Sequence, residues 1–153
     1  MDVFEKLDNL FAMYESFTYD YLLKLAKDEA DYIYRMVRSR DGDESAKNFI
    51  TSYAAILSRC NFRPNETEYG FAKSAISSLN LTADNFRLLG DKLIGDYDVK
   101  MMFREYSKET NLDLRFDHAM MIFALCLCAS DGQINDSQRR FITDFVPLPG
   151  IAD

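Results

Sequence analysis

The longest apolar segment of the chain, Ala119 to Ala129, contains no charged residue and is followed directly by Ser130-Asp131-Gly132. A membrane-spanning helix needs about 20 apolar residues, and this segment has about half that length. A helix that is apolar on every side belongs in the interior of a protein. The sequence therefore predicts a buried central helix, with the remaining helices packed around it.

Apolar residues recur at helical spacing elsewhere, for example at Leu7, Phe11 and Tyr14. Gly (6) and Pro (3) are too few to supply the many turns of an all-β fold. We therefore predict an all-α bundle of about seven helices. Residues 1–43 are expected to form an N-terminal helical extension, which contains either two helices or one bent helix. Residues 44–153 are expected to form a single helical domain.

Capping residues and glycines indicate where several helices begin and end. Thr82 is placed to cap a short helix, and Gly90 and Gly95 are expected to interrupt that helix. Asn135 followed by Gln138 has the pattern of a capping box, in which two residues at a helix start bond each other's backbone. The last helix is predicted to begin at this pair and to cover roughly residues 136–145.

The charge and the cysteines restrict the classes of partner and compartment. With 18 Lys and Arg against 25 Asp and Glu, the formal net charge is −7. This balance argues against binding to nucleic acids or to anionic membranes, because both rely on clustered cations. The N-terminus has no basic segment followed by an apolar stretch, and the cysteines (Cys60, Cys126 and Cys128) are odd in number. We expect a cytoplasmic protein with reduced cysteines and no direct membrane insertion.

Two stretches of the chain resemble each other. Ser58 to Glu66 and Ser130 to Gln138 each follow an apolar helix and lead into another helix, and they begin 72 positions apart. Each stretch holds one apolar residue, Phe62 or Ile134, that is placed to enter the core. The similarity predicts two pseudo-symmetric helical hairpins.

The segment Ala124 to Gln138 resembles the signature of the TerB-like family, which is named for the tellurite-resistance protein B. That signature is a helix rich in small residues, then Ala-Asp-Gly, an aliphatic residue and a later Glu. The resemblance spans about residues 46–146 and implies an all-α fold with two similar halves. This chain departs from the signature at Gln138, which stands where the family has Glu, and at Arg59, which replaces the loop acid of the first copy.

The resemblance also implies a candidate cofactor, a divalent cation such as Ca²⁺ or Mg²⁺ bound by Asp131, Asp136 and Gln138. Such hard cations take oxygen ligands and gain affinity from carboxylate charge. The alternative is that the same residues only build a corner between two helices. Gly132 then permits the turn, Asn135 and Gln138 cap the helix, and Asp131 lies near the helix N-terminus, where negative charge is stabilising.

A search for catalytic groups finds two candidates. The single histidine, His118, has none of the spaced partners that a zinc site requires. Asp113 and Asp117 lie one turn apart on one helix face, where they form either a solvated first turn or part of an acidic site. A metal-dependent enzyme or ion-sensing domain is therefore the alternative function, and it requires these two acids to converge with Asp131 and Asp136.

Aromatic residues suggest an interaction surface. The chain has 9 Tyr and 12 Phe but no Trp, and several tyrosines, including Tyr19, Tyr21, Tyr32 and Tyr34, fall in the first forty residues. Tyrosine is enriched at protein interfaces because it combines apolar area with a polar tip. These four residues are our candidates for contact with a protein partner or with a second copy in a homodimer. We expect a non-enzymatic TerB-like interaction or scaffold module of a bacterial stress-response or phage-defence system.

Overall fold

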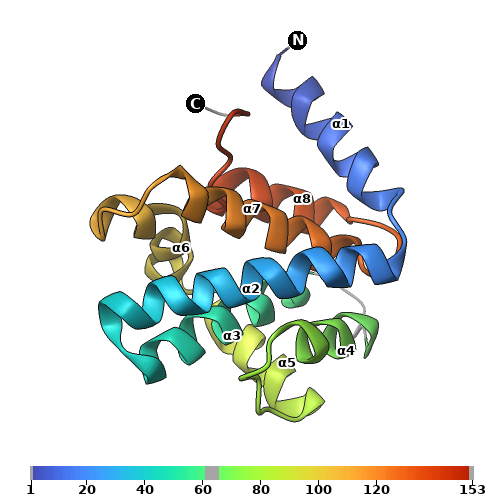
Figure 1. Cartoon of the computed structure of the whole chain (residues 1–153). Helices are drawn as coiled ribbons and strands as arrows, with labels where there is room; N and C mark the ends of the chain where they lie inside the picture. Colours follow the sequence, from blue (N-terminus) through green and yellow to red (C-terminus); the bar gives the residue numbers. More distant parts are fainter. Residues whose placement is uncertain (1, 61–65, 152–153) are drawn as a thin grey trace.

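The computed structural model describes residues 2–60 and 66–151, and Figure 1 shows the arrangement of the helices. These residues form eight α-helices and no strand, which confirms the all-α prediction. In chain order the helices are α1 (Val3–Glu15), α2 (Tyr19–Asp41), α3 (Asp43–Arg59), α4 (Glu66–Ala75), α5 (Ala83–Leu93), α6 (Tyr97–Glu109), α7 (Leu114–Ala129) and α8 (Asp136–Phe145).

The predicted central helix is α7, and the structure confirms its burial. Every residue from Phe123 to Ser130 is buried, including Cys126 and Cys128, which lie on different sides of the helix. Helices α1, α2, α3, α4, α6 and α8 all pack against it. Among the helices of the described residues, none is long and apolar enough to cross a membrane.

The N-terminal segments form two separate helices rather than one bent helix. Thr18 separates them, and its hydroxyl accepts the Tyr21 backbone N–H (3.2 Å) as the N-cap of α2. Helix α2 lies along α7 and also packs against α3, with Leu22, Ala26 and Ile33 in the common core. The residues assigned to an N-terminal extension therefore supply one of the main helices of the core.

One ion pair joins α2 to α7. The guanidinium of Arg115 donates two hydrogen bonds to the carboxylate of Glu29, from Nη1 (2.6 Å) and Nη2 (3.0 Å). The same guanidinium lies over the ring of Tyr32, 4.1 Å from its centroid. Glu29 is buried, and the bidentate geometry satisfies both of its oxygens. The pair therefore fixes how α2 and α7 are aligned.

The two similar stretches belong to helical hairpins with matching boundaries. Arg59 and Ala129 end α3 and α7, and Glu66 and Asp136 begin α4 and α8, so each pair is 70 positions apart. The structural offset is thus two residues shorter than the offset of 72 read from the sequence. The difference arises because Ser58 lies inside α3, whereas Ser130 follows α7. Phe62, predicted to enter the core, lies outside the described residues.

Gly90 does not interrupt its helix, contrary to the sequence prediction. Helix α5 begins after its N-cap Thr82, as expected, but continues through Gly90 to Leu93. A Cβ atom on Gly90 would lie 2.6 Å from the carbonyl oxygen of Ala55 and 2.9 Å from the Cβ atom of Arg59. The glycine is therefore needed where α5 crosses α3, and an ion pair between Arg59 and Asp91 lies beside this crossing.

We predict that Gly90→Ala destabilises the protein by about 1–3 kcal/mol, because the new methyl group meets backbone atoms of α3 that cannot move alone. Gly70→Ala in α4 is the matched control, since nothing lies within 4 Å of a Cβ atom at that position. Alanine has the higher helix propensity, so the control should gain about 0.5–1 kcal/mol. Urea unfolding of both variants measures the difference. Equal effects at the two positions would contradict the close approach of α5 to α3.

Candidate functional site

The residues that carry the family resemblance form the turn between α7 and α8, residues 130–135, which we call the Asp-Gly corner. Gly132 has φ +96°, a backbone conformation that side chains resist, and its N–H donates to the carbonyl of Ala129 (2.9 Å). The carboxylate of Asp131 accepts the backbone N–H of Gln133 (3.2 Å). Ile134 enters the core, as predicted, and is 1% exposed. Local bonds thus account for the shape of the corner.

Asn135 and Gln138 form the predicted capping box at the start of α8. The side chain of Asn135 accepts the Gln138 backbone N–H (2.8 Å), and the side-chain oxygen of Gln138 accepts the Asn135 backbone N–H (3.2 Å). These bonds satisfy two backbone donors that a helix start otherwise leaves without partners.

Gln138 also joins the two hairpins to each other. Its amide nitrogen Nε2 donates to the carboxylate of Glu68 (2.8 Å) in α4 and to the carbonyl of Leu57 (3.3 Å) in α3. Gln138 and Glu68 are both fully buried and occupy the same position in α8 and α4. Residues at the same position in two symmetric hairpins can touch only where they lie close to the twofold axis that relates the hairpins. Gln138 and Glu68 therefore lie near this axis. Glutamine suits this position, because its amide can donate to Glu68 and the carboxylate of a Glu cannot.

Helix α1 is fastened to the Asp-Gly corner by Glu15. Its carboxylate accepts the backbone N–H of Ile134 (2.8 Å) and a hydrogen bond from Nη2 of Arg139 (3.1 Å). Arg139 in turn donates from Nε to the carbonyl of Ile134 (2.9 Å) and lies over the ring of Phe11. The N-terminal helix therefore supplies polar bonds to the corner, a role that the sequence did not suggest.

The structure places the three candidate metal ligands in different surroundings. Gln138 is fully buried and its side-chain atoms bond Asn135, Glu68 and Leu57, whereas Asp131 and Asp136 are exposed. Within residues 2–60 and 66–151 there is no group of three or more His, Cys, Asp or Glu side chains positioned to hold a metal ion. Of the three candidate ligands, Gln138 thus already uses its side chain for bonds within the protein, and the carboxylates of Asp131 and Asp136 are exposed.

The second pair of acids lies at the opposite end of α7. Asp113 is the N-cap of this helix and accepts the Arg115 backbone N–H (3.0 Å). Helix α7 has 16 residues and spans about 24 Å, which separates Asp113 from Asp131. Asp117 is half-buried, and burial raises the pKa of its carboxyl. The four acids therefore do not form one cluster but lie at two helix starts.

The cysteines are buried and only weakly acidic. Burial raises the pKa of the Cys60 thiol and of the Cys126 thiol to about 12, and it raises the pKa of Cys128 well above its usual value. Because the thiolate is the nucleophilic form, these side chains are poorly suited to covalent chemistry at neutral pH. His118 is exposed near the start of α7, about two turns from Cys126.

The four candidate interaction tyrosines differ in their surroundings. Tyr32 and Tyr34 are half-buried, with Tyr32 beneath Arg115 and the Tyr34 hydroxyl donating to the carboxylate of Asp43. Tyr19 and Tyr21 are more exposed, at 40% and 47%, and their rings contact Phe71 and Phe17 at one edge. Tyr19 and Tyr21 thus present more surface to a partner than the other two.

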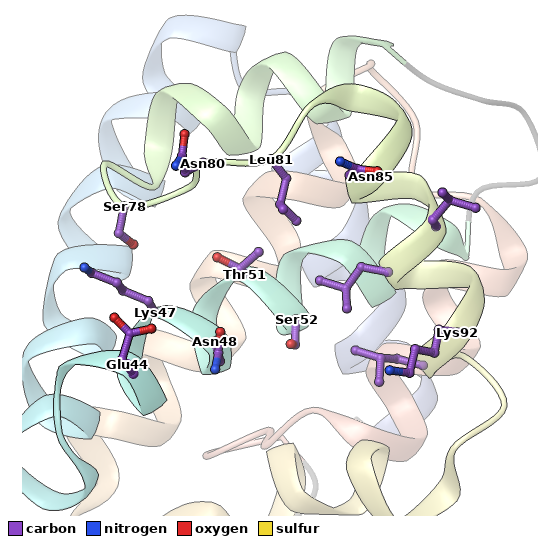
Figure 2. Close-up of a pocket in the computed structure, with 13 residues that line it drawn as sticks. Glu44, Lys47, Asn48, Thr51, Ser52, Ser78, Asn80, Leu81, Asn85 and Lys92 are labelled. Carbon is purple, nitrogen blue, oxygen red and sulfur yellow. The ribbon is translucent and has the colours of Figure 1, made fainter.

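A second candidate site is a groove of about 820 Å³ between α3 and α5, shown in Figure 2. The connection between α4 and α5 closes part of its rim through Ser78, Asn80 and Leu81. The groove was not predicted from the sequence, because no local pattern indicates that α5 borders the polar face of α3. Helical spacing alone assigns that face to solvent.

Comparison with protein-family models, with curated proteins and with solved structures finds no match for this chain. The TerB-like resemblance therefore rests on the residues of the Asp-Gly corner and on the two similar hairpins.

The contact between Gln138 and Glu68 leads to a testable prediction. Gln138→Glu should destabilise the protein by about 3–5 kcal/mol at pH 7, because it buries two carboxylates against each other. The loss should shrink as the pH falls toward 5, since one carboxyl then takes up the proton that replaces the missing donor. Urea unfolding at several pH values measures both effects.

The exchanged pair, Glu68→Gln with Gln138→Glu, is the matched control. It restores one amide opposite one carboxylate and should recover much of the stability at pH 7. An exchanged variant as unstable as Gln138→Glu alone, with the same dependence on pH, would contradict the direct contact between these side chains.

Proposed function

We propose that this protein is a non-enzymatic interaction module of the TerB-like kind, which binds another protein in a bacterial stress-response or phage-defence system. The binding surface is the N-terminal part of α1, and the partner carries an apolar pocket with a basic rim. The observation that carries the proposal is the exposure of Phe4, whose side chain is 73% exposed although it continues the buried stripe of its helix.

The apolar stripe of α1 extends beyond the core. Leu7, Phe11 and Tyr14 occupy one face of the helix and are buried, and Val3 and Phe4 lie on the same side one turn earlier. In Figure 1 this end of α1 projects past the other helices. An apolar stripe that extends beyond the core supports contact with a partner, because burying such side chains away from water is favourable.

The charge around this surface favours a different protein over a second copy. Asp2, Glu5 and Asp8 are exposed on the same turns as Val3 and Phe4. Two copies that joined these faces would bring their carboxylates together, at a cost in repulsion. A partner with Lys or Arg around an apolar pocket complements both the charge and the apolar area.

The non-enzymatic part of the proposal rests on how the polar groups are used. Asp113 and Asn135 cap helices, Gln138 joins the hairpins, and Glu15 fastens α1. The link through Glu15 also holds α1 in a fixed position on the bundle. A surface that is held in place loses less conformational entropy on binding than a mobile one.

Site-specific photocrosslinking in cells of the native host tests the proposal. A photoreactive residue at Phe4 should give one prominent adduct with another protein, whereas one at Leu114, which is 65% exposed on α7, should not. Asp8→Lys should weaken the Phe4 adduct at least severalfold, because it reverses the charge beside the surface. Phe4 is too exposed for its replacement to change stability by more than about 0.5 kcal/mol.

Two outcomes would contradict the proposal. The same set of adducts from Phe4 and Leu114 would show that the α1 surface has no preferred partner. A Phe4 adduct with the mass of two copies of the chain would show that the surface binds a second copy and not a basic partner protein.

A further inference from the structure

Helix α3 has two faces of different chemistry. One face carries Phe49, Ile50 and Tyr53 and packs into the core. The opposite face carries polar side chains at positions 44, 47, 48, 51 and 52, and α5 and the α4–α5 connection border it. Glu44 and Asn48 are exposed, whereas Thr51 and Ser52 are half-buried. The polar face therefore forms the floor of a groove that is open to solvent.

The two helices pack together around one close approach, and the groove lies beside it. Gly90 of α5 meets Ala55 of α3 where the polar face ends, so a direct backbone approach anchors the two helices. The groove is bounded by residues 44–52 of α3 and 85–93 of α5, and its volume is about 820 Å³. Pockets for small molecules commonly measure about 300–1,000 Å³, so the groove is large enough for a metabolite.

The groove contains many hydrogen-bonding groups that the protein does not use. The side chains of six lining residues make no hydrogen bond to any other described residue: Asn48, Thr51, Ser52, Ser78, Asn80 and Asn85. They come from three consecutive parts of the wall, α3, the α4–α5 connection and α5 (Figure 2). Hydroxyl and amide groups that converge on one groove suit a ligand that has many donors and acceptors of its own.

Charge indicates where an anionic group would lie. Lys47 is already paired with Asp43 (2.9 Å), and Glu44 lines the same end of the groove. Lys92 lies across the groove on α5 and has no ion pair among the described residues. A single anionic group is therefore favoured beside Lys92, and the carboxylate of Glu44 disfavours a second one at the Lys47 end.

Leucines complete the wall on the α5 side. Leu81 and Leu89 are half-buried, and Leu88 is 56% exposed. They line the same groove as the hydroxyl and amide groups of α3 and add apolar area to it. The groove thus combines one free cation, a row of uncharged polar groups and an apolar side.

We propose that this groove binds a small metabolite with one phosphate and several hydroxyl groups, namely a nucleoside monophosphate or a sugar monophosphate. The phosphate contacts Lys92, the hydroxyl groups bond Asn48, Thr51 and Ser52, and the less polar face of the ring packs on Leu81 and Leu89. The site is separate from the α1 surface, so either proposal can fail without the other.

Titrations followed by ¹⁵N–¹H NMR distinguish a nucleoside monophosphate from a sugar monophosphate. Adenosine monophosphate and glucose 6-phosphate are the test ligands. Adenosine, glucose and inorganic phosphate, each of which is one part of a test ligand, are the counterparts for comparison. At least one phosphorylated ligand should shift the amide signals of residues 47–52 and 85–92. It should bind at least about tenfold more tightly than its unphosphorylated counterpart and than inorganic phosphate, because each counterpart forms only part of the contacts.

Three variants distinguish binding in the groove from nonspecific attraction of anions to surface lysines. Lys92→Gln should weaken binding at least about tenfold, because it removes the charge that faces the phosphate. Lys24→Gln on α2 removes an exposed lysine far from the groove and should leave the affinity unchanged. Thr51→Val, which keeps the side-chain shape, should weaken the phosphorylated ligand severalfold and inorganic phosphate not at all.

The proposal is overturned if no ligand of the panel shifts the groove signals at millimolar concentration. It is also overturned if Lys24→Gln and Lys92→Gln weaken binding equally, or if the unphosphorylated compounds bind as tightly as the phosphorylated ones. Amide spectra of the variants confirm in each case that the fold is retained.

Discussion

The burial of α7 on every side from Phe123 to Ala129 is the constraint on which the rest of the structure depends. A helix without a polar face cannot lie on a surface, so six other helices must surround it. Close packing around one helix leaves little freedom in how its neighbours are aligned. That alignment is set by a small number of polar bonds, of which the buried contact between Gln138 and Glu68 lies closest to the centre of the two hairpins.

These polar bonds share one feature, which is that each joins segments distant in the chain. Glu29 binds Arg115 across α2 and α7, Glu15 binds the backbone of Ile134, and Gln138 bonds both α3 and α4. A buried polar group without a partner costs about 1–3 kcal/mol, so each of these contacts opposes any alternative packing of the same helices. We infer that Glu15, Glu29 and Gln138 serve to hold helices together and that the Asp-Gly corner itself is a structural turn, and this is the central claim of our account.

The sequence was sufficient for features that depend on neighbouring residues. The caps at Thr82 and Asn135 and the buried character of α7 follow from local bonding and from periodicity, and the structure confirms them. The predicted offset between the two hairpins was two residues too long, because the sequence alone does not show at which residue the backbone hydrogen bonds of α3 and α7 end. With the observed offset, Glu68 and Gln138 occupy the same position in the two hairpins.

Features that depend on how distant segments meet could not be predicted. Gly90 looked like a helix breaker, since only the position of Ala55 in space shows why a glycine is needed there. The groove was missed for the same reason, because only the positions of α5 and of the α4–α5 connection show that they border the polar face of α3. Glu15 gave no signal, as its partner Ile134 lies 119 positions away.

The most direct test of the central claim is a thermal-melt titration of the parent protein and of Asp131→Asn with Ca²⁺, Mg²⁺ and Mn²⁺ against a chelator. An ion that binds the native state raises the melting temperature by mass action, by several degrees when it is present at about 100 times its dissociation constant. Our account predicts that no ion stabilises the parent protein more than the variant, because the Asp131 carboxylate accepts the Gln133 backbone N–H within the turn and the Gln138 side chain is bonded to α3 and α4. A rise that one ion produces in the parent and not in Asp131→Asn would contradict it and would show that the corner binds metal.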